Sequence, residues 1–367
     1  MRGVAGSFER SWSGEPGTVP WTRMLEHVAF VYEAASSVAR ARAGKRRARL
    51  EGCHVLAIGN LTVGGTGKST IARWLALEAV KTGGRAAILL RGHGAATPEP
   101  GVVPDFKDYP VEAGAARYGD EAVALRRGLP PAAVVAVDPD RARAGRAVRD
   151  GYGARVVILD DGWEQSGLRW DELWVAIDPR RPVGNGSLLP AGPLRRPASS
   201  LREATRAVFL LEERDETVPE TTLAWLARTA PGLPYLRLRR TLCGTTALRS
   251  LERPEALAPG VKVAVLSGIG APRRLERFLR AAGAELLVHD AYPDHARWEI
   301  PALESSLRRA ERAGAAMILI TEKDEPRWPS GLTPALPLRV IRTGVQPLDS
   351  VEEALRPIQE PRHASRV

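Results

Sequence analysis

CHVLAIGNLTVGGTGKSTIARWLAL, residues 53–77, places an apolar run, a glycine-rich turn and a helical pattern in the order that a phosphate-binding loop requires. The apolar run Val55–Ile58 predicts a strand, and the apolar residues that follow Ser69 predict a helix. Glycines let backbone N–H groups converge on phosphate oxygens, and the helix N-terminus adds a favourable dipole. The alternative is a glycine-rich turn without a ligand, but the flanking strand and helix favour a nucleoside triphosphate site.

The residues of this loop have expected roles. We expect Lys68 to reach the β- and γ-phosphates and the Ser69 hydroxyl to bind Mg²⁺. The strict pattern G-x-x-x-x-G-K-[ST] places glycine where this chain has Thr62. The residues predicted to bind the nucleotide are Thr62, Val63, Gly64, Gly65, Thr66, Gly67, Lys68, Ser69 and Thr70. The loop indicates the phosphate donor and leaves the acceptor open.

Composition narrows the class of partner and the compartment. The chain has 367 residues, 44% of them hydrophobic, a net charge of +10 and a pI near 10.1. This length favours two domains, and the basic surface favours anionic partners. There is no RNA-binding signature, zinc-finger spacing or basic stripe interleaved with aromatic residues, so we expect no nucleic acid partner. Two cysteines, Cys53 and Cys243, cannot form a disulfide framework, which fits a reducing cytoplasm.

The N-terminal region indicates a contact with a membrane surface. Residues 1–20 predict a disordered extension, and Met24 is an alternative start. Residues 21–49 predict an amphipathic helix that ends in a basic run, which is typical of a helix on an anionic membrane surface. A helix docked on the protein's own core has the same periodicity, so both interpretations stay open. No run approaches the length that spans a bilayer.

We predict an α/β fold with a P-loop NTPase-type, mostly parallel sheet and helices on both faces. Residues 50–232 would form this kinase-like domain, because apolar strands alternate with helices there. Residues 233–350 would form a second, smaller α/β domain, joined through a half-exposed β-ribbon linker at 231–253, and 351–367 a tail. The predicted strands of the first domain are Val55–Ile58, Arg85–Leu90, Ala132–Val137, Arg155–Leu159, Leu173–Ile177 and Ala207–Leu211, with a long loop at 95–110.

A pair of acids follows one of these strands. Asp160 and Asp161 lie at the carboxyl end of Arg155–Leu159, where an open parallel sheet binds its ligands. Mg²⁺ beside Ser69 requires a carboxylate, and a second acid could face the acceptor. The alternative is a pair that caps a helix N-terminus.

Several motifs in order along the chain resemble one family. The sequence is similar to the tetraacyldisaccharide 4′-kinases, or lipid A 4′-kinases, over roughly residues 21–345. The resemblance rests on GNLTVGGTGKST, ILLRGHGA, YGDEAVALRR, VVILDDGWEQ, VGNGSLLPAGPLRRP, SGIGAPRRLERFLRAAG, AYPDHARW and LITEKD. Members of this family also have threonine at the position of Thr62. The resemblance implies transfer of the γ-phosphate of ATP to the 4′-hydroxyl of an acylated glucosamine disaccharide 1-phosphate, at the cytoplasmic face of the inner membrane.

The resemblance also implies roles for acids that the residue pattern alone leaves as caps or loop residues. Asp120 would be the general base that accepts the hydroxyl proton, with His295 as its partner. Glu121 and Asp160 would bind the metal beside Ser69. Asp161 would act near the transferred phosphoryl group, where Lys68 also lies.

Some features leave alternatives open. Members of the family usually have the sequence DDGFQH where this chain has DDGWEQ. Glu164 and Gln165 therefore replace the Gln-His pair of the family. Two alternatives therefore stay open. The protein could be a diverged kinase of the same fold that acts on another sugar or lipid acceptor, or a membrane-associated protein that binds a nucleotide without turnover. The segment 321–324, TEKD, predicts either an adenine contact or a charged turn. Candidates for phosphate contacts are Arg91, Arg141, Arg195 and Arg196.

Overall fold

The computed structural model describes residues 47–92, 100–105, 111–164, 167–212, 215, 217–293 and 298–360, and seven positions between 25 and 38. The strands are β1 His54–Asn60, β2 Ala86–Leu90, β3 Gly101–Val102, β4 Ala133–Val137, β5 Val156–Leu159, β6 Glu172–Ile177, β7 Arg206–Leu211, β8 Tyr235–Ala247, β9 Lys262–Ser267, β10 Glu285–Ala291, β11 Met317–Thr321 and β12 Leu338–Pro347. The helices are α3 Lys68–Lys81, α4 Val111–Tyr118, α5 Asp120–Arg127, α6 Arg141–Tyr152, α7 Glu220–Thr229, α8 Pro272–Ala281, α9 Ile300–Arg312 and α10 Glu352–Gln359. Two short 3₁₀ helices are η1 Ala198–Glu203 and η2 Glu325–Arg327.

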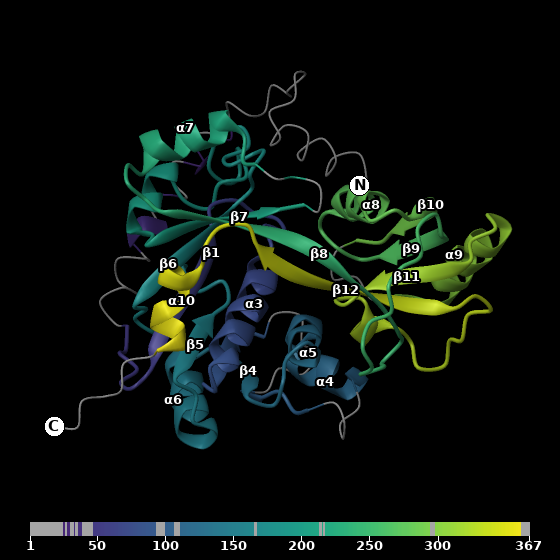
Figure 1. Ribbon diagram of the computed structural model, residues 1–367, viewed down its shortest axis with the longest axis horizontal. Coiled ribbons are helices and arrows are strands. Elements are labelled where there is room, and N and C mark those ends of the chain that lie inside the picture. Colours follow the sequence, from purple (N-terminus) through teal and green to yellow (C-terminus); the bar gives the residue numbers. More distant parts are fainter. Residues whose placement is uncertain are drawn as a thin grey trace.

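The strands form one continuous sheet. Their order is β10-β9-β11-β12-β8-β7-β6-β1-β5-β2-β4-β3 (Figure 1). The pairs β8–β12 and β3–β4 are antiparallel, and the other neighbours are parallel. The predicted α/β fold with a mostly parallel sheet is confirmed. Because β1 lies between β5 and β6, the carboxyl ends of several strands meet beside the loop that follows β1.

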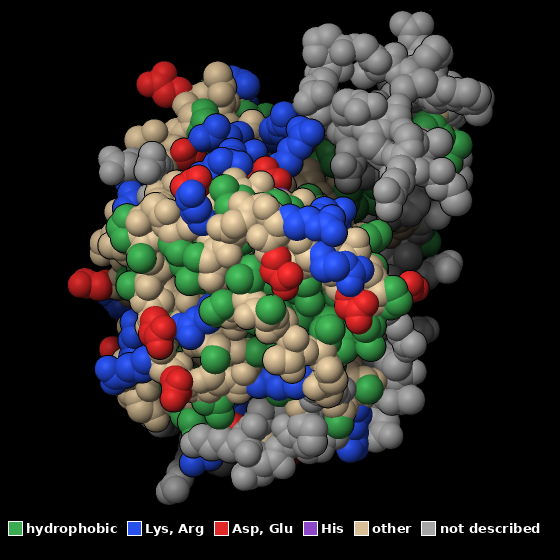
Figure 2. Space-filling view, turned by 90° about the vertical axis from the view of Figure 1, so that its right-hand side faces the viewer, with side chains coloured by type: hydrophobic (Ala, Val, Ile, Leu, Met, Phe, Trp, Pro, Cys, Tyr) green, Lys and Arg blue, Asp and Glu red, His purple; other side chains and the backbone are tan. Residues whose placement is uncertain are grey.

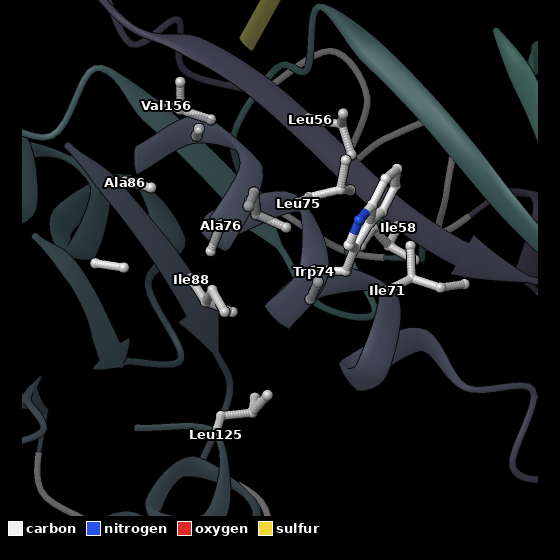
Figure 3. Packing of buried hydrophobic residues seen from close by; sticks show 14 of the residues in the cluster. Leu56, Ile58, Ile71, Trp74, Leu75, Ala76, Ala86, Ile88, Leu125 and Val156 are labelled. Atoms are coloured by element: carbon white, nitrogen blue, oxygen red, sulfur yellow. The ribbon is translucent and has the colours of Figure 1, made fainter. Parts of the chain in front are cut away.

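Both faces of the sheet around β1 are buried, because successive side chains of a strand point to opposite faces. Leu56 and Ile58 pack with the helices α3, α5 and α10 on one face. Figure 3 shows this face, with Ile71 and Leu75 of α3 beside the side chains of β1. Val55 and Ala57 point to the other face and pack with α6 and α7. This two-sided burial explains why the strand reads as a continuous apolar run.

The ribbon that we predicted at 231–253 corresponds to β8 (Figure 1). This strand is parallel to β7 and antiparallel to β12, so it continues the sheet into the C-terminal strands. The α/β pattern that we predicted within 233–350 is present, because strands and helices alternate there as β9, α8, β10, α9 and β11. The partner of the ribbon, β12, lies about a hundred residues further along the chain, a distance that local patterns do not report. The division at residues 232 and 233 stays a prediction.

Three segments differ from what the sequence predicted. The long loop at 95–110 contains the edge strand β3, which pairs with β4. The helix α4 precedes α5 and was not predicted. Residues 351–367, predicted as a tail, contain α10, whose Ala354, Leu355 and Ile358 are buried against the face that carries α3. Each of these elements is short, and short elements give weak periodic signals.

Replacing Leu355 by alanine tests whether α10 belongs to the folded core. Leu355 is 1% exposed, so the Leu355→Ala variant should lower the free energy of unfolding by about 2–5 kcal/mol. Urea denaturation measures this change. The exposed Glu353 on the same helix is the matched control, and Glu353→Ala should change the free energy by no more than about 0.5 kcal/mol. Equal effects of the two substitutions would contradict the packing of α10.

Candidate active site

The last glycine of the loop after β1 is closely packed. Gly67 precedes α3 with a φ of 87°, a left-handed conformation that favours glycine. A Cβ at this position would lie 2.3 Å from Leu210 Cδ2, so space as well as conformation requires glycine. Lys68 Nζ donates a 2.7 Å hydrogen bond to Asn60 Oδ1 and lies 3.2 Å from Asp161 Oδ1. The ammonium group is therefore held over the loop, facing the acids that follow β5.

A second segment supports the start of the loop. Val63 N donates to Pro193 O at 2.8 Å, and Arg195 N donates to Leu61 O at 2.7 Å. Thr62 forms an antiparallel bridge with Leu194 and is largely buried. The backbone of Thr62 thus pairs with the segment around 193–195, which gives this residue a structural role at the position where the strict pattern has glycine.

The hydroxyl and carboxylates predicted to bind a metal come together. Ser69 Oγ donates a 2.6 Å hydrogen bond to Glu121 Oε1. Asp160 follows β5 and is 4% exposed, and its Oδ1 is buried without a hydrogen-bond partner among the described residues. The described parts of the chain hold no group of three or more His, Cys, Asp or Glu side chains suited to a metal. Two carboxylates and a hydroxyl nevertheless fit Mg²⁺, which is commonly completed by phosphate oxygens and water.

Burial and neighbouring charges separate the pKa values of these acids. Burial, assisted by the charge of Glu121, raises the pKa of Asp160 to about 6, against the opposing effect of Lys68. Burial also raises the pKa of Glu121, but Lys323, the Ser69 hydrogen bond and Lys68 outweigh it, so the net pKa is lowered. Asp160 is thus the carboxyl group of this cluster that titrates nearest to neutral pH.

Asp161 is the acid of this pair that faces the cations. Arg195 Nη1 lies 3.1 and 3.0 Å from the two carboxylate oxygens of Asp161. Burial raises the pKa of Asp161, but Lys68 and Arg195 more than offset that effect, so its pKa is lowered. Asp161 adopts a φ of 53°, in the left-handed region that is uncommon for residues other than glycine. The two adjacent acids therefore have different environments.

Asp120 has a partner that the sequence did not reveal. It is the first residue of α5, after Gly119, and its side chain is largely buried. Asp120 Oδ1 accepts a 2.9 Å hydrogen bond from Glu121 N, and Asp120 Oδ2 lies 3.1 Å from Arg327 Nε. His295, the partner that we predicted, lies outside the described residues. The signal that could have indicated Arg327 is the charged turn that follows the strand ending in Thr321.

Arg141 is buried beside the acids. It is 2% exposed, and its Nη2 donates to the backbone oxygen of Asp160 at 3.2 Å. Its Nε and Nη1 have no acceptor within the described part of the chain, and burial lowers the pKa of Arg141 to about 10. Buried guanidinium groups are normally paired, so these two donors indicate a place for an anion. Arg91, at the end of β2, is exposed nearby.

Arg196, in contrast, is used within the protein. Its guanidinium group stacks on the ring of Trp163, 4.5 Å from the centroid. Arg196 Nε donates to Glu164 Oε1 at 2.8 Å, and Arg196 Nη1 donates to Glu203 Oε2 at 3.2 Å. The negative charge of Glu164, which replaces a neutral residue of the family pattern, is therefore balanced by Arg196. Gln165 lies outside the described residues.

A cavity of about 510 Å³ begins beside the phosphate loop. It runs between α3, the end of α5 and the β8–β12 pair, and Thr70, Trp74 and Glu322 are among the residues that line it. The Trp74 Nε1 donor is buried without a partner among the described residues. Glu322 pairs with Arg73 at 2.8 Å, so part of the 321–324 segment serves protein contacts. An adenine contact at this segment stays a prediction.

Two further observations concern the surface. None of the described helices is both long and apolar enough to pass through a lipid bilayer. Of the predicted N-terminal helix, the described positions are helical, with Ala29 buried and Val28 and Val38 about half exposed. Figure 2 shows several separate groups of Lys and Arg side chains, mixed with acidic and apolar ones, on the side of the molecule that faces the viewer.

Known proteins share this sequence pattern and fold. Residues 21–357 match the family described as tetraacyldisaccharide-1-P 4′-kinase. A tetraacyldisaccharide 4′-kinase of Anaeromyxobacter sp. (strain K) is 38% identical over 328 residues, which cover 86% of this chain and 85% of that protein. Another from Methylobacterium sp. (strain 4-46) is 35% identical, covering 90% of this chain and 91% of that protein.

The fold has a counterpart among solved structures. The crystal structure of the "apo" form of LpxK from Aquifex aeolicus in complex with ATP superposes with a TM-score of 0.67 at 22% identity. The superposition covers 92% of this chain and 98% of that one. Because the family match spans nearly the whole sequence and the relatives match over most of their length, this protein belongs to the tetraacyldisaccharide-1-P 4′-kinase family.

Proposed function

We propose that this protein transfers the γ-phosphate of ATP to the 4′-hydroxyl of a tetraacyl glucosamine disaccharide 1-phosphate. The observation that carries the proposal is the convergence of Lys68, Ser69 and the acids Glu121, Asp160 and Asp161 at one end of the sheet. This set supplies a cation for the phosphates and oxygen ligands for a metal. The family to which the chain belongs supports the choice of acceptor.

Residues of this chain fit a magnesium ion. Ser69, Asp160 and Glu121 would hold Mg²⁺, and the buried Oδ1 of Asp160 supports this assignment. When bound, Mg²⁺ neutralises phosphate charge and orients the phosphate oxygens. Lys68 would neutralise further charge on the β- and γ-phosphates, and Asp161 would hold Lys68 and Arg195 in place.

A base must accept the proton of the attacking hydroxyl. We assign this role to Asp120, whose carboxylate lies next to Glu121 at the start of α5. His295 would orient Asp120 or share its proton, as the family pattern implies. A carboxylate can accept the hydroxyl proton when it is held in a suitable orientation, and the contacts with Glu121 N and Arg327 Nε hold Asp120.

The other parts of the two substrates have candidate positions. Arg141, which has two donors without an acceptor among the described residues, and the nearby Arg91 and Arg195 would bind phosphate of the acceptor. The cavity that begins at Thr70 would receive the adenosine of ATP, since it adjoins the residue that follows Ser69.

The acceptor is a lipid, so the protein would work at a membrane surface. Residues 21–49 would bind the anionic cytoplasmic face of the inner membrane as a peripheral anchor. The exposed Val28 and Val38 support an apolar face that the protein core does not cover. Ala29, in contrast, is buried.

A second candidate function is transfer to another sugar or lipid. The replacement of the family's Gln-His pair by Glu164 and Gln165 is the observation that favours this second function, although Arg196 balances the charge of Glu164. A panel of acceptors with labelled ATP separates the two. Transfer to the tetraacyl disaccharide 1-phosphate supports the first function, and ATP binding with transfer only to a different acceptor supports the second.

Lys68→Ala tests the role of the phosphate loop. Loss of the ammonium group should abolish transfer of labelled phosphate to the disaccharide acceptor, because Lys68 is the cation placed over the loop. Lys262→Ala, at the exposed start of β9, is the control and should retain wild-type kcat. Near-normal transfer by Lys68→Ala would remove the loop from the mechanism.

The pKa of Asp160 predicts how Mg²⁺ binding depends on pH. Only the carboxylate binds the metal, and with a pKa of about 6 Asp160 is largely protonated below that pH. At subsaturating Mg²⁺ and with a non-hydrolysable ATP analogue, the metal-induced rise in Tm should be full at pH 8 and fade as pH falls through about 6. Asp160→Asn should show a small rise at every pH. A rise and pH dependence equal to those of the wild type would exclude Asp160 as a ligand.

Deleting residues 1–43 tests membrane attachment. The full chain should co-sediment with vesicles that contain anionic lipid, and the deletion should release it, because the apolar face of the helix is lost. Vesicles of neutral lipid serve as the control and should bind the full chain weakly. Undiminished binding of the shortened protein to anionic vesicles would assign the helix to the protein's own core.

A further inference from the structure

We propose that Arg327 is a positioning residue for Asp120, through which the turn at 321–327 fixes the orientation of the general base. The inference rests on the role proposed above for Asp120. It adds a residue from the C-terminal strands to a site that is otherwise built around β1, β5 and α5. Arg327 lies 207 positions after Asp120 in the sequence, and its side chain is 11% exposed.

The guanidinium group of Arg327 is itself firmly held. Its Nε lies 3.1 Å from Asp120 Oδ2 and donates to the backbone oxygen of Lys323 at 3.2 Å. Its Nη2 lies 3.3 Å from Asp324 Oδ1 and donates to the backbone oxygen of Gly268 at 3.1 Å. A planar group with contacts on several sides has little freedom to rotate, so it can fix the carboxylate that it meets.

The residues that hold Arg327 are anchored in turn. Asp324 is fully buried and accepts hydrogen bonds from Gly268 N at 3.0 Å and from Thr321 Oγ1 at 2.5 Å. Gly268 follows β9 and Thr321 ends β11, which are neighbouring strands of the sheet. The position of Arg327 is therefore set by two strands, and the contact to Asp120 transmits that position to α5.

The same turn faces the neighbouring acid with a second cation. Lys323 Nζ lies 3.0 Å from Glu121 Oε1, the oxygen that also accepts from Ser69. Asp120 and Glu121 are adjacent, and two ionised carboxylates so close repel each other. One cation for each acid reduces that repulsion and gives each carboxylate a separate direction. This pairing indicates that the turn orients the two acids in addition to packing η2.

An ion pair that merely joins two parts of the protein would also place Arg327 here. The two roles differ in what its loss changes. If Arg327 positions Asp120, its loss slows the transfer step and does so only when Asp120 is present. If Arg327 is purely structural, its loss lowers stability and weakens both binding and transfer, whatever residue occupies position 120. A double-mutant cycle separates them, because residues that act as a unit give non-additive losses.

The experiment measures kcat, the KM for ATP and Tm for Arg327→Met, Asp120→Asn and the double variant, with labelled ATP and the disaccharide acceptor. Arg327→Met should lower kcat about 10²-fold with the KM for ATP nearly unchanged, because a misplaced catalytic group can cost about that much. In the Asp120→Asn background, the same substitution should lower kcat by less than about threefold. Arg327→Lys, which keeps a cation without the planar fork, should recover part of the loss.

Arg309 provides the matched control. It forms an Arg–Asp pair with Asp290 at 2.7 Å on the surface of the C-terminal part, away from Asp120, and Arg309→Met should leave kcat unchanged. The inference is wrong if the kcat losses of the two single variants multiply in the double variant, or if Arg327→Met keeps the wild-type kcat. Either result leaves the proposed role of Asp120 in place. Full kcat in Asp120→Asn would instead remove Asp120 from the proposed mechanism, and the inference with it. If Arg327→Met does not fold, the cycle is run with Arg327→Lys against the same criteria.

Discussion

The contact of Lys68 with both Asn60 and Asp161 is the interaction on which the site depends. Asn60 ends β1 and Asp161 follows β5, so one ammonium group connects the ends of two neighbouring strands. The parallel pairing of these strands is what brings the two residues to the same edge. The helix α3 begins at Lys68 itself, so its N-terminus is fixed relative to the same two strands. Placement of the phosphate loop is thus a consequence of sheet register.

Charge balance organises the rest of the site. Four carboxylates lie close together, and each has an environment of its own: Asp161 faces Lys68 and Arg195, Glu121 faces Lys323, Asp120 faces Arg327, and Asp160 is buried. The cations come from segments that are far apart in the sequence. Because unlike charges in a partly buried site interact strongly, the arrangement of these segments decides which acid stays ionised. Asp160, the acid with the raised pKa, is one of the two carboxylates that we propose to bind Mg²⁺.

Much of this could be predicted from local sequence. The strand–loop–helix around Gly67, the acids after β5 and the alternation of apolar strands with helices all follow from nearby residues, and the structure confirms them. Contacts between distant segments could not be predicted. The pairing of β8 with β12 and that of Arg327 with Asp120 each join residues about a hundred or more positions apart, and no periodic pattern encodes such a distance. Short elements such as α10 were missed because they complete too few turns.

The position of β12 has a consequence for how the protein is made. It is the last strand in the sequence, yet it lies inside the sheet between β11 and β8. While a ribosome synthesises the chain, the strands up to β8 and the group β9–β11 can each pair, but no strand pairing of the described sheet links the two groups until residues 338–347 emerge. The turn at 321–327 therefore takes its final place beside α5 only after β12 has been synthesised. A nascent chain that stops before residue 338 would carry a phosphate loop without a completed site.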